Sequence, residues 1–124
     1  MTHSTKISML IVDDYGPLHA SLRRDLRHAP ANLRVAGSAH EALELIADEV
    51  PDLVLSDYRM EGSIDGLTLL ERVHAEHPAV CCVLHTGEAV DTTLQVSSFP
   101  VLFKPCPLSA ILELIESVRE GRGP

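Results

Sequence analysis

Residues 7–14 read ISMLIVDD, a run of six mostly large aliphatic residues that ends at two adjacent acids. The run is too short for a stable helix, so it predicts a buried strand. Directly after it, Leu18, Leu22 and Leu26 lie four residues apart, and Pro17 stands near the beginning of this pattern. Such spacing predicts an amphipathic helix, whose first turn tolerates proline because that N–H has no helical partner. A strand followed at once by a helix is the repeating unit of α/β proteins.

The same alternation continues along the rest of the chain. Short apolar runs predict further strands at residues 33–36, 53–56, 79–84 and 101–103. Residues 90–98 are rich in Val, Thr and Ser, which are mediocre helix formers. We therefore expect the fourth helix to be short or irregular.

Capping residues and apolar stripes indicate the remaining helices. Ser38 and Glu41 form a capping box, and Asp65 can cap the helix after the third strand. The apolar residues expected to face inward are Ala42, Leu45 and Ile46 in the second helix, Leu67, Leu70 and Val73 in the third, and Leu108, Ile111, Leu112, Ile115 and Val118 in the last.

Five strands alternating with five helices predict a doubly wound α/β fold. We expect a five-stranded parallel sheet of flavodoxin-like (βα)5 topology, with strand order 2-1-3-4-5 and right-handed crossovers. A chain of 124 residues suits one domain, so residues 1–124 form a single unit with its core over about 6–120. The hydrophobic content of 45% is enough to fill that core.

The composition excludes several classes of protein. A net charge of −8 argues against direct binding of nucleic acid through its phosphates. No apolar run approaches the ~20 residues that span a bilayer, so we expect no membrane segment. Cys81, Cys82 and Cys106 have neither a disulfide nor a metal-binding spacing, which favours reduced thiols and a cytoplasmic protein.

Reactive side chains follow four of the five predicted strands. Asp13 and Asp14 follow the first strand, Asp57 the third, Thr86 the fourth and Lys104 the fifth. The second strand, which lies on the far edge of this sheet, is followed by no such group. Ligands of open α/β sheets bind outside the carboxyl ends of the strands, near the reversal of strand order. We therefore expect these five side chains to meet at one rim.

Such a set of groups suits phosphoryl transfer. Three neighbouring carboxylates repel each other, and a divalent cation with oxygen ligands, Mg²⁺ in particular, relieves that repulsion. A carboxylate beside Mg²⁺ can attack phosphorus to give an acyl phosphate. Lys104 can place a positive charge on the phosphoryl oxygens, and the Thr86 hydroxyl can donate a hydrogen bond to one of them.

On the motifs Asp13-Asp14, Asp57, Thr86 and Lys104-Pro105, in this order, nearly the whole chain resembles the receiver domains of two-component response regulators, the CheY-like family. The resemblance implies that Asp57 is the phosphoacceptor. It also implies that Asp14 and Asp57 bind Mg²⁺ directly, together with the backbone carbonyl of Arg59, and that Asp13 acts largely through water.

The resemblance further implies the roles of the phosphate-binding residues and the partners. Thr86 would be the switch hydroxyl, Gly87 and Lys104 would contact the phosphate with it, and the bond to Pro105 would be cis. The phosphoryl group would come from a phosphohistidine on a histidine kinase or histidine phosphotransfer protein. The chain would not be an enzyme in the usual sense, because it promotes its own phosphorylation and autodephosphorylation. The resulting switch would alter binding to an unknown downstream protein.

Three departures from the family pattern concern the switch, the output face and the loop beside Asp57. Val101 stands where many receivers carry an aromatic residue, and the stretch between Thr86 and Lys104 is about a turn short. The loop after Asp57 is one residue longer than usual. Arg59, two residues past Asp57, is expected to shield the acyl phosphate from water through an ion pair with Glu88.

Other functions remain open at this point. The acids could be ordinary loop or capping residues, although Lys104 and Thr86 would then be unexplained. A phosphatase of the haloacid dehalogenase type would need Asp-x-Asp after its first strand, and a flavodoxin-like FMN binder would need a Ser/Thr/Gly loop there. A receiver-like interaction module without phosphorylation is the third alternative. The sequence does not tell a free-standing domain from part of a larger protein, or a monomer from a homodimer.

Several residues could have either a functional role or a purely structural one. His74 and His77 could share a metal but favour a solvated helix end, and His85 is expected to pack on the face opposite Thr86. Cys106 could have a lowered thiol pKa near a helix start. A basic patch that could dock a kinase or simply be solvated consists of Arg23, Arg24, Arg27 and His28.

Overall fold

The structure, a computed structural model, describes residues 6–60, 62–87 and 99–121. Its strands are β1 (Ile7–Val12), β2 (Ala31–Ala36), β3 (Leu53–Ser56), β4 (Cys81–Thr86) and β5 (Val101–Phe103). Its helices are α1 (Gly16–Asp25), α2 (Ala39–Asp48), α3 (Gly66–Glu76) and α5 (Leu108–Arg119). The short helix predicted over 90–98 falls outside the described residues.

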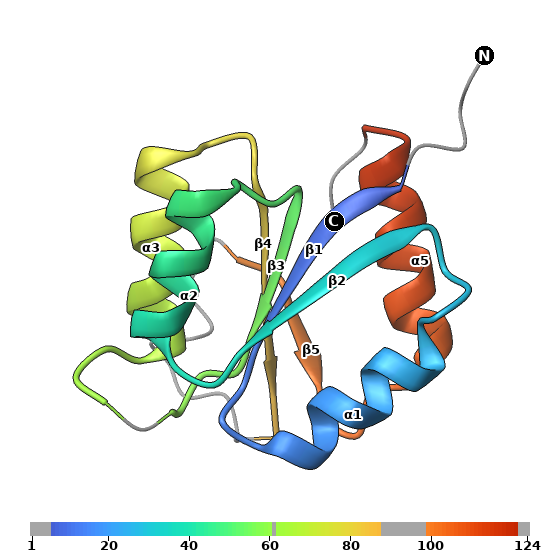
Figure 1. Ribbon diagram of the computed structural model, residues 1–124, viewed down its shortest axis with the longest axis horizontal. Coiled ribbons are helices and arrows are strands. Elements are labelled where there is room, and N and C mark those ends of the chain that lie inside the picture. The colour runs from blue at the N-terminus through green and yellow to red at the C-terminus, as the bar shows by residue number, and fades with distance from the viewer. Residues whose placement is uncertain (1–5, 61, 88–98, 122–124) are drawn as a thin grey trace.

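All strands pair in parallel, in the order β2-β1-β3-β4-β5, which confirms the predicted fold. Helices α2 and α3 cover one face of the sheet, and α1 and α5 cover the other (Figure 1). The order reverses between β1 and β3. The carboxyl ends of these two strands therefore flank the position where such sheets bind ligands.

Two strands differ from their predicted bounds. β4 begins at Cys81 rather than at residue 79, because Pro78 and a turn bond from the Val80 N–H to the His77 carbonyl (3.0 Å) occupy the preceding residues. It continues to Thr86, whose carbonyl accepts from the Lys104 N–H at 3.0 Å. β2 begins two residues earlier than predicted, at Ala31, which pairs in register with Ile7.

The sheet separates two apolar layers. Side chains alternate along each strand, so Leu10 and Val12 of β1 pack toward α2 and α3, while Met9 and Ile11 pack toward α1 and α5. β3 and β4 are buried along their whole length, as expected for central strands of a parallel sheet.

One helix face differs clearly from its prediction. Leu108 and Leu112 of α5 are exposed, at 38% and 37%, whereas Leu114, which was not predicted to face inward, is buried with Ile111 and Ile115. α5 is apolar around more than half its circumference, and packing against the sheet selects the stripe that includes Leu114. In α3, similarly, Leu69 is fully buried while Leu67 is only half-buried.

The predicted helix caps are present. The Ser38 hydroxyl accepts from the Glu41 N–H at 3.1 Å, and the Glu41 carboxylate accepts from the Gly37 N–H at 2.7 Å. The Asp65 carboxylate accepts from the Thr68 N–H at 2.8 Å. Each cap satisfies N–H groups that the first helical turn leaves without backbone partners.

Arg34 of β2 closes the other end of α2. Its guanidinium donates to the Leu45 carbonyl at 2.8 Å and to the Glu49 carbonyl at 2.7 Å, where the last turn of α2 carries no basic residue of its own. Arg34→Met keeps the aliphatic stem but removes both charged donors. We expect it to lower the free energy of unfolding by about 2 kcal/mol in urea denaturation. Arg23→Met, on the exposed face of α1, is the matched control and should change it little.

Candidate functional site

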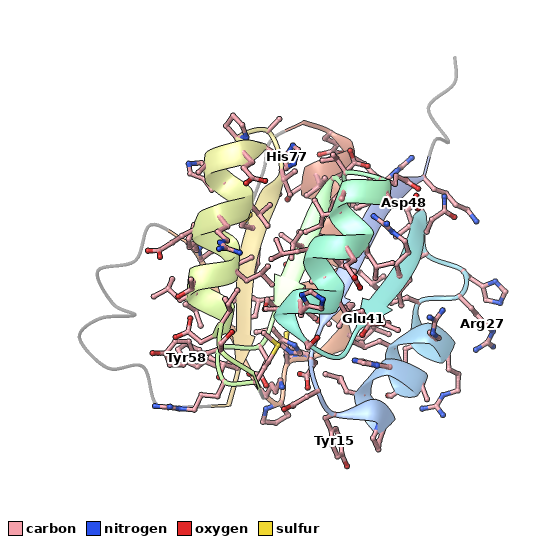
Figure 2. All side chains as sticks on the ribbon, turned by 60° about the vertical axis from the view of Figure 1, so that its left-hand side comes forward. Tyr15, Arg27, Glu41, Asp48, Tyr58 and His77 are labelled. Atoms are coloured by element: carbon pink, nitrogen blue, oxygen red, sulfur yellow. The ribbon has the colours of Figure 1, made fainter. Side chains whose placement is uncertain are left out.

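The site lies at the carboxyl ends of four neighbouring strands. Asp13 and Asp14 follow β1, Asp57 follows β3, Thr86 ends β4 and Lys104 follows β5. In Figure 2, Tyr15 and Tyr58, which adjoin the acids in sequence, lie at one end of the molecule and His77 at the other. The parallel sheet thus gathers side chains from both halves of the chain at one rim.

The three carboxylates lie close enough to share one cation. Asp13, Asp14 and Asp57 each offer a carboxylate oxygen, and these oxygens all lie within 4.8 Å of one another. Opposite ligands of an octahedral Mg²⁺ are ~4.2 Å apart, so small movements would complete such a shell. Asp13 is buried, Asp57 half-buried and Asp14 exposed. The oxygen-only donor set and the open outer side fit Mg²⁺, which keeps several of its waters.

Lys104 joins the end of β5 to this cluster. Its Nζ lies 2.6 Å from Asp13 Oδ2, whose side chain is 2% exposed, and 3.4 Å from Asp57 Oδ2. Burial alone would lower the pKa of Lys104. The hydrogen bond and charge of Asp13, with those of Asp57, outweigh burial and raise this pKa above its ordinary value. Lys104 is therefore a permanent cation at the rim.

Asp57 is less acidic than an ordinary aspartate. Burial raises its pKa most, and the charge of Asp13 raises it further, while Lys104 and a hydrogen bond from the Tyr58 N–H oppose the rise. An ionised Asp57 therefore costs folding free energy until a cation joins the cluster.

From this raised pKa we predict that Asp57→Asn stabilises the metal-free protein at neutral pH. An acid whose pKa is raised in the folded state destabilises the fold at any pH above that pKa, where it is ionised. Asp57→Asn removes this cost, so its gain in the free energy of unfolding should be largest at those pH values. The gain should disappear as the pH falls toward the ordinary value of 3.8, where wild-type Asp57 is protonated in both states. Urea denaturation of both proteins across this pH range, in EDTA, measures the difference. A gain that grew on acidification would contradict the prediction.

Backbone contacts that the sequence did not reveal hold Asp57 in place. The Tyr58 N–H donates to Asp57 Oδ1 at 2.8 Å, and the Ser56 hydroxyl donates to the Asp57 carbonyl at 2.9 Å. Gly66, the first residue of α3, lies so close that a Cβ there would be 1.7 Å from the same carbonyl oxygen. Its N–H also donates to the Tyr58 carbonyl at 2.7 Å. Gly66 follows the predicted cap Asp65, which was the only hint in the sequence.

Comparison with known proteins identifies the family. The model of the response regulator receiver domain matches residues 9–116 of the chain. The chain belongs to the response regulator receiver domain family.

Similar sequences and similar solved structures support this assignment to the receiver domain family. The transcriptional regulator NtrC of Escherichia coli K12 is 32% identical over 110 residues, which cover 86% of this chain and 23% of NtrC. ZraR of Salmonella typhimurium is 33% identical over 115 residues, which cover 90% of this chain and 26% of ZraR. A signal receiver domain of an HD domain-containing protein from Pseudomonas fluorescens Pf-5 superposes with a TM-score of 0.85 at 28% identity, covering 94% of this chain and 97% of that one. The receiver domain therefore spans about a quarter of the length of the curated relatives it matches.

The remaining predicted site residues of the receiver domain lie at or near the rim. Thr86 is fully buried and pairs in register with Phe103, and Gly87 follows it on the surface. The bond between Lys104 and Pro105 is cis, as the family resemblance implies. Val101 is half-buried at the start of β5.

Arg59 is exposed, and its guanidinium lies 5.3 Å from the centre of the Tyr58 ring, within the range of a cation–π contact. The predicted ion pair between Arg59 and Glu88 remains a prediction, because Glu88 falls outside the described residues. The backbone of Arg59 follows Asp57 closely enough in sequence for its carbonyl to remain a candidate metal ligand.

The structure bears out some of the expectations for the cysteines and histidines and contradicts one of them. Burial raises the pKa of the Cys106 thiol, so the lowered pKa considered from the sequence is wrong. Cys81 and Cys82 are free and buried, as expected. His85 lines a pocket with residues of α1 and α5, and the alternation of side chains along β4 places Thr86 on the opposite face, as expected. His74 instead makes an edge-on contact with Phe99, with ring centres 5.9 Å apart.

Among residues 6–60, 62–87 and 99–121, no helix combines the length and the apolar character that crossing a bilayer requires.

Proposed function

We propose that this receiver domain accepts a phosphoryl group from a phosphohistidine onto Asp57, with Mg²⁺ held by the neighbouring acids. The single observation that carries the proposal is that the Lys104 ammonium contacts two of the three clustered carboxylates, those of Asp13 and Asp57. A surface cluster of acids alone would not place a half-buried cation between two of them.

The chain's own residues divide the work of this reaction. Oδ1 of Asp57 is held by the Tyr58 N–H, which leaves Oδ2, the oxygen nearest Lys104, to attack phosphorus. The new bond joins this oxygen to phosphorus, the bond from phosphorus to the donor's imidazole nitrogen breaks, and that nitrogen keeps the electron pair. Lys104 would then turn from Asp13 toward the phosphoryl oxygens, and the Thr86 hydroxyl would donate to one of them.

The acids would hold Mg²⁺ with unequal roles. Asp14 and Asp57 and the Arg59 carbonyl are the candidate direct ligands. Asp13 Oδ2 already accepts from Lys104, which supports its assignment to contact through water. When bound, Mg²⁺ supplies positive charge that offsets the repulsion between carboxylates and phosphoryl oxygens.

Signalling requires two partners. The phosphodonor would be a histidine kinase or histidine phosphotransfer protein, and the exposed basic residues of α1 are available to contact it. The downstream target would be another protein, or a further domain of the kind that the longer relatives have room for. Direct nucleic-acid contact is not proposed for this acidic domain, and a cytoplasmic location remains part of the proposal.

Labelling with a small phosphodonor tests the proposal. Acetyl phosphate with Mg²⁺ should add one phosphoryl group, detected as a mass shift of the intact protein. The shift should be absent in Asp57→Asn and in EDTA, and should remain in Asp48→Asn, an exposed acid on α2. If the wild-type protein is not labelled while a partner protein still binds it, the chain is an interaction module that keeps the fold without the chemistry. Turnover of a phosphate ester would instead indicate a phosphatase.

Arg59 should control how long the acyl phosphate lasts. Its stacked, exposed guanidinium can cover the outer side of Asp57, so Arg59→Ala should admit water and shorten the phosphoryl half-life several-fold, an effect on the order of 1 kcal/mol in the hydrolysis barrier. The decay of the mass shift after donor removal measures this. Arg72→Ala, on the exposed side of α3, is the control. An unchanged half-life in Arg59→Ala would show that Arg59 does not protect the acyl phosphate from water.

A further inference from the structure

A pocket separate from the acid cluster opens between α1, α5 and the loop after β5. It is open to solvent on one side and has a volume of about 310 Å³, and we call it the α1–α5 pocket. Its walls are mainly aliphatic, with Leu18 and Leu22 from α1 and Leu108 and Ile111 from α5. Its outer edge includes Tyr15, which is 63% exposed at the start of α1 (Figure 2). The pocket explains why Leu108, expected in the core, stays accessible.

His85 is the polar group of this pocket. It is 4% exposed and lines the pocket from the end of β4. No described residue forms a hydrogen bond or ion pair with it. Buried imidazoles normally have a partner, because each ring carries one N–H donor and one nitrogen acceptor. An imidazole that faces a cavity and has no partner among the described residues is therefore suited to bind a ligand.

The charge of the pocket restricts the class of ligand. Burial, and then the charge of Lys104, lower the pKa of His85 to about 4, so the imidazole is neutral at pH 7. Lys104 also lines the pocket, but its ammonium is paired with Asp13. Asp25 at the margin lies 3.6 Å from the Arg24 guanidinium. The charged side chains that line the pocket, Lys104 and Asp25, each have a partner of opposite charge, so they would not bind an ionic ligand strongly. Burying a charge against the aliphatic walls would also cost free energy.

We propose that the α1–α5 pocket binds a small uncharged molecule with an apolar body and one hydroxyl or N–H group, which hydrogen-bonds His85. The size agrees, because apolar cavities of ~150 Å³ already bind a benzene ring and ligand pockets begin at ~300 Å³. The ligand would also contact Pro105 and the stem of Lys104. Binding to the unphosphorylated chain does not depend on the proposed function of Asp57.

Three probes of similar shape test the proposal by NMR titration of the unphosphorylated domain. 4-Methylphenol carries an apolar ring and a hydroxyl, toluene lacks the hydroxyl, and benzoate carries a charge. We expect 4-methylphenol to shift the resonances of His85 and its pocket neighbours saturably. It should bind about tenfold more tightly than toluene, as one buried hydrogen bond allows, and benzoate should not bind.

Variants distinguish the contribution of the His85 hydrogen bond to binding from that of the space in the pocket. His85→Phe keeps a buried ring and removes both nitrogens, so the preference for 4-methylphenol over toluene should vanish. Ser21→Phe on α1 narrows the opening and should weaken both, which keeps the test valid if His85→Phe folds poorly. Arg23→Ala, on the same helix but outside the pocket, should change neither.

Several results would overturn the proposal. The first is that none of the probes gives a saturable shift at pocket residues. A preference for 4-methylphenol that survives in His85→Phe would show that His85 does not bind the ligand. Benzoate binding as tightly as 4-methylphenol would make it a site for anions. Shifts at the pocket that appear only with an added phosphodonor protein would make it part of a docking surface.

Discussion

Gly66→Ala should nearly abolish phosphorylation of Asp57 and destabilise the fold at the same time. A Cβ at this position would lie 1.7 Å from the Asp57 carbonyl oxygen and 2.7 Å from its carbonyl carbon, so the backbone of one or the other must move. The movement also strains the bond from the Gly66 N–H to the Tyr58 carbonyl, which holds the loop beside Asp57. The smallest possible side chain thus displaces the residue that is proposed to react.

The expected size of this effect follows from the displacement. Overpacking at a rigid position costs about 3 kcal/mol of the free energy of unfolding. A shift of ~1 Å in a reacting group slows reaction on the order of 100-fold. Urea denaturation and the rate of labelling by acetyl phosphate measure the two consequences separately.

Gly16→Ala is the matched control. It makes the same substitution at the first residue of α1, where a Cβ would meet nothing within 4 Å. It should leave stability and labelling close to those of the wild type. If Gly66→Ala labelled at the wild-type rate, the close approach of α3 to Asp57 would have no role in positioning that residue.

Lys104→Met should slow phosphorylation at least as strongly as Gly66→Ala does. Its ammonium is the cation proposed to meet the phosphoryl oxygens, and removing one such group typically costs 10²–10³-fold in rate, to order of magnitude. The substitution also leaves the buried Asp13 carboxylate without the partner 2.6 Å away. Unpairing a buried charge costs about 3 kcal/mol, so the metal-free variant should be less stable by that amount.

Added Mg²⁺ should distinguish these two effects. The variant has one more uncompensated negative charge at the rim, so Mg²⁺ should raise its melting temperature more than that of the wild type, while labelling stays slow. Lys104→Arg keeps the charge with a different donor geometry, and we expect it to retain stability but label slowly. Equal labelling rates in Lys104→Met and the wild type would show that Lys104 has only a structural role.

The sequence predicted which side chains meet at the rim because a parallel sheet makes their positions predictable. Residues that follow buried strands must meet at one rim, so Asp13, Asp57 and Lys104 could be placed together from the strand pattern alone. Helix starts were equally accessible, because Ser38 and Asp65 act on N–H groups only three residues away.

The sequence could not show what holds Asp57, because these contacts act through backbone atoms or depend on tertiary distance. Gly66 matters through the side chain it lacks, and Ser56 through a bond to a neighbouring carbonyl. Tyr58 contributes its N–H rather than its ring. None of these roles requires a recognisable pattern of residue types.

The sequence also did not show which face of α5 packs against the sheet. α5 has apolar residues on several sides, and periodicity alone did not show that Leu114, rather than Leu112, packs inward. The same uncertainty hid the α1–α5 pocket, since Leu108 was assigned to the core although it borders an opening.

The bond between Lys104 and Asp13 joins residues 91 positions apart, which directly follow the last strand and the first strand. A ribosome making this protein therefore releases the acids long before the lysine that pairs with them. Nascent chains arrested before Lys104 emerges should react poorly with acetyl phosphate, however well their earlier strands have assembled. Chemical competence would then report completion of the sheet, and unfinished chains would not compete with finished ones for the donor.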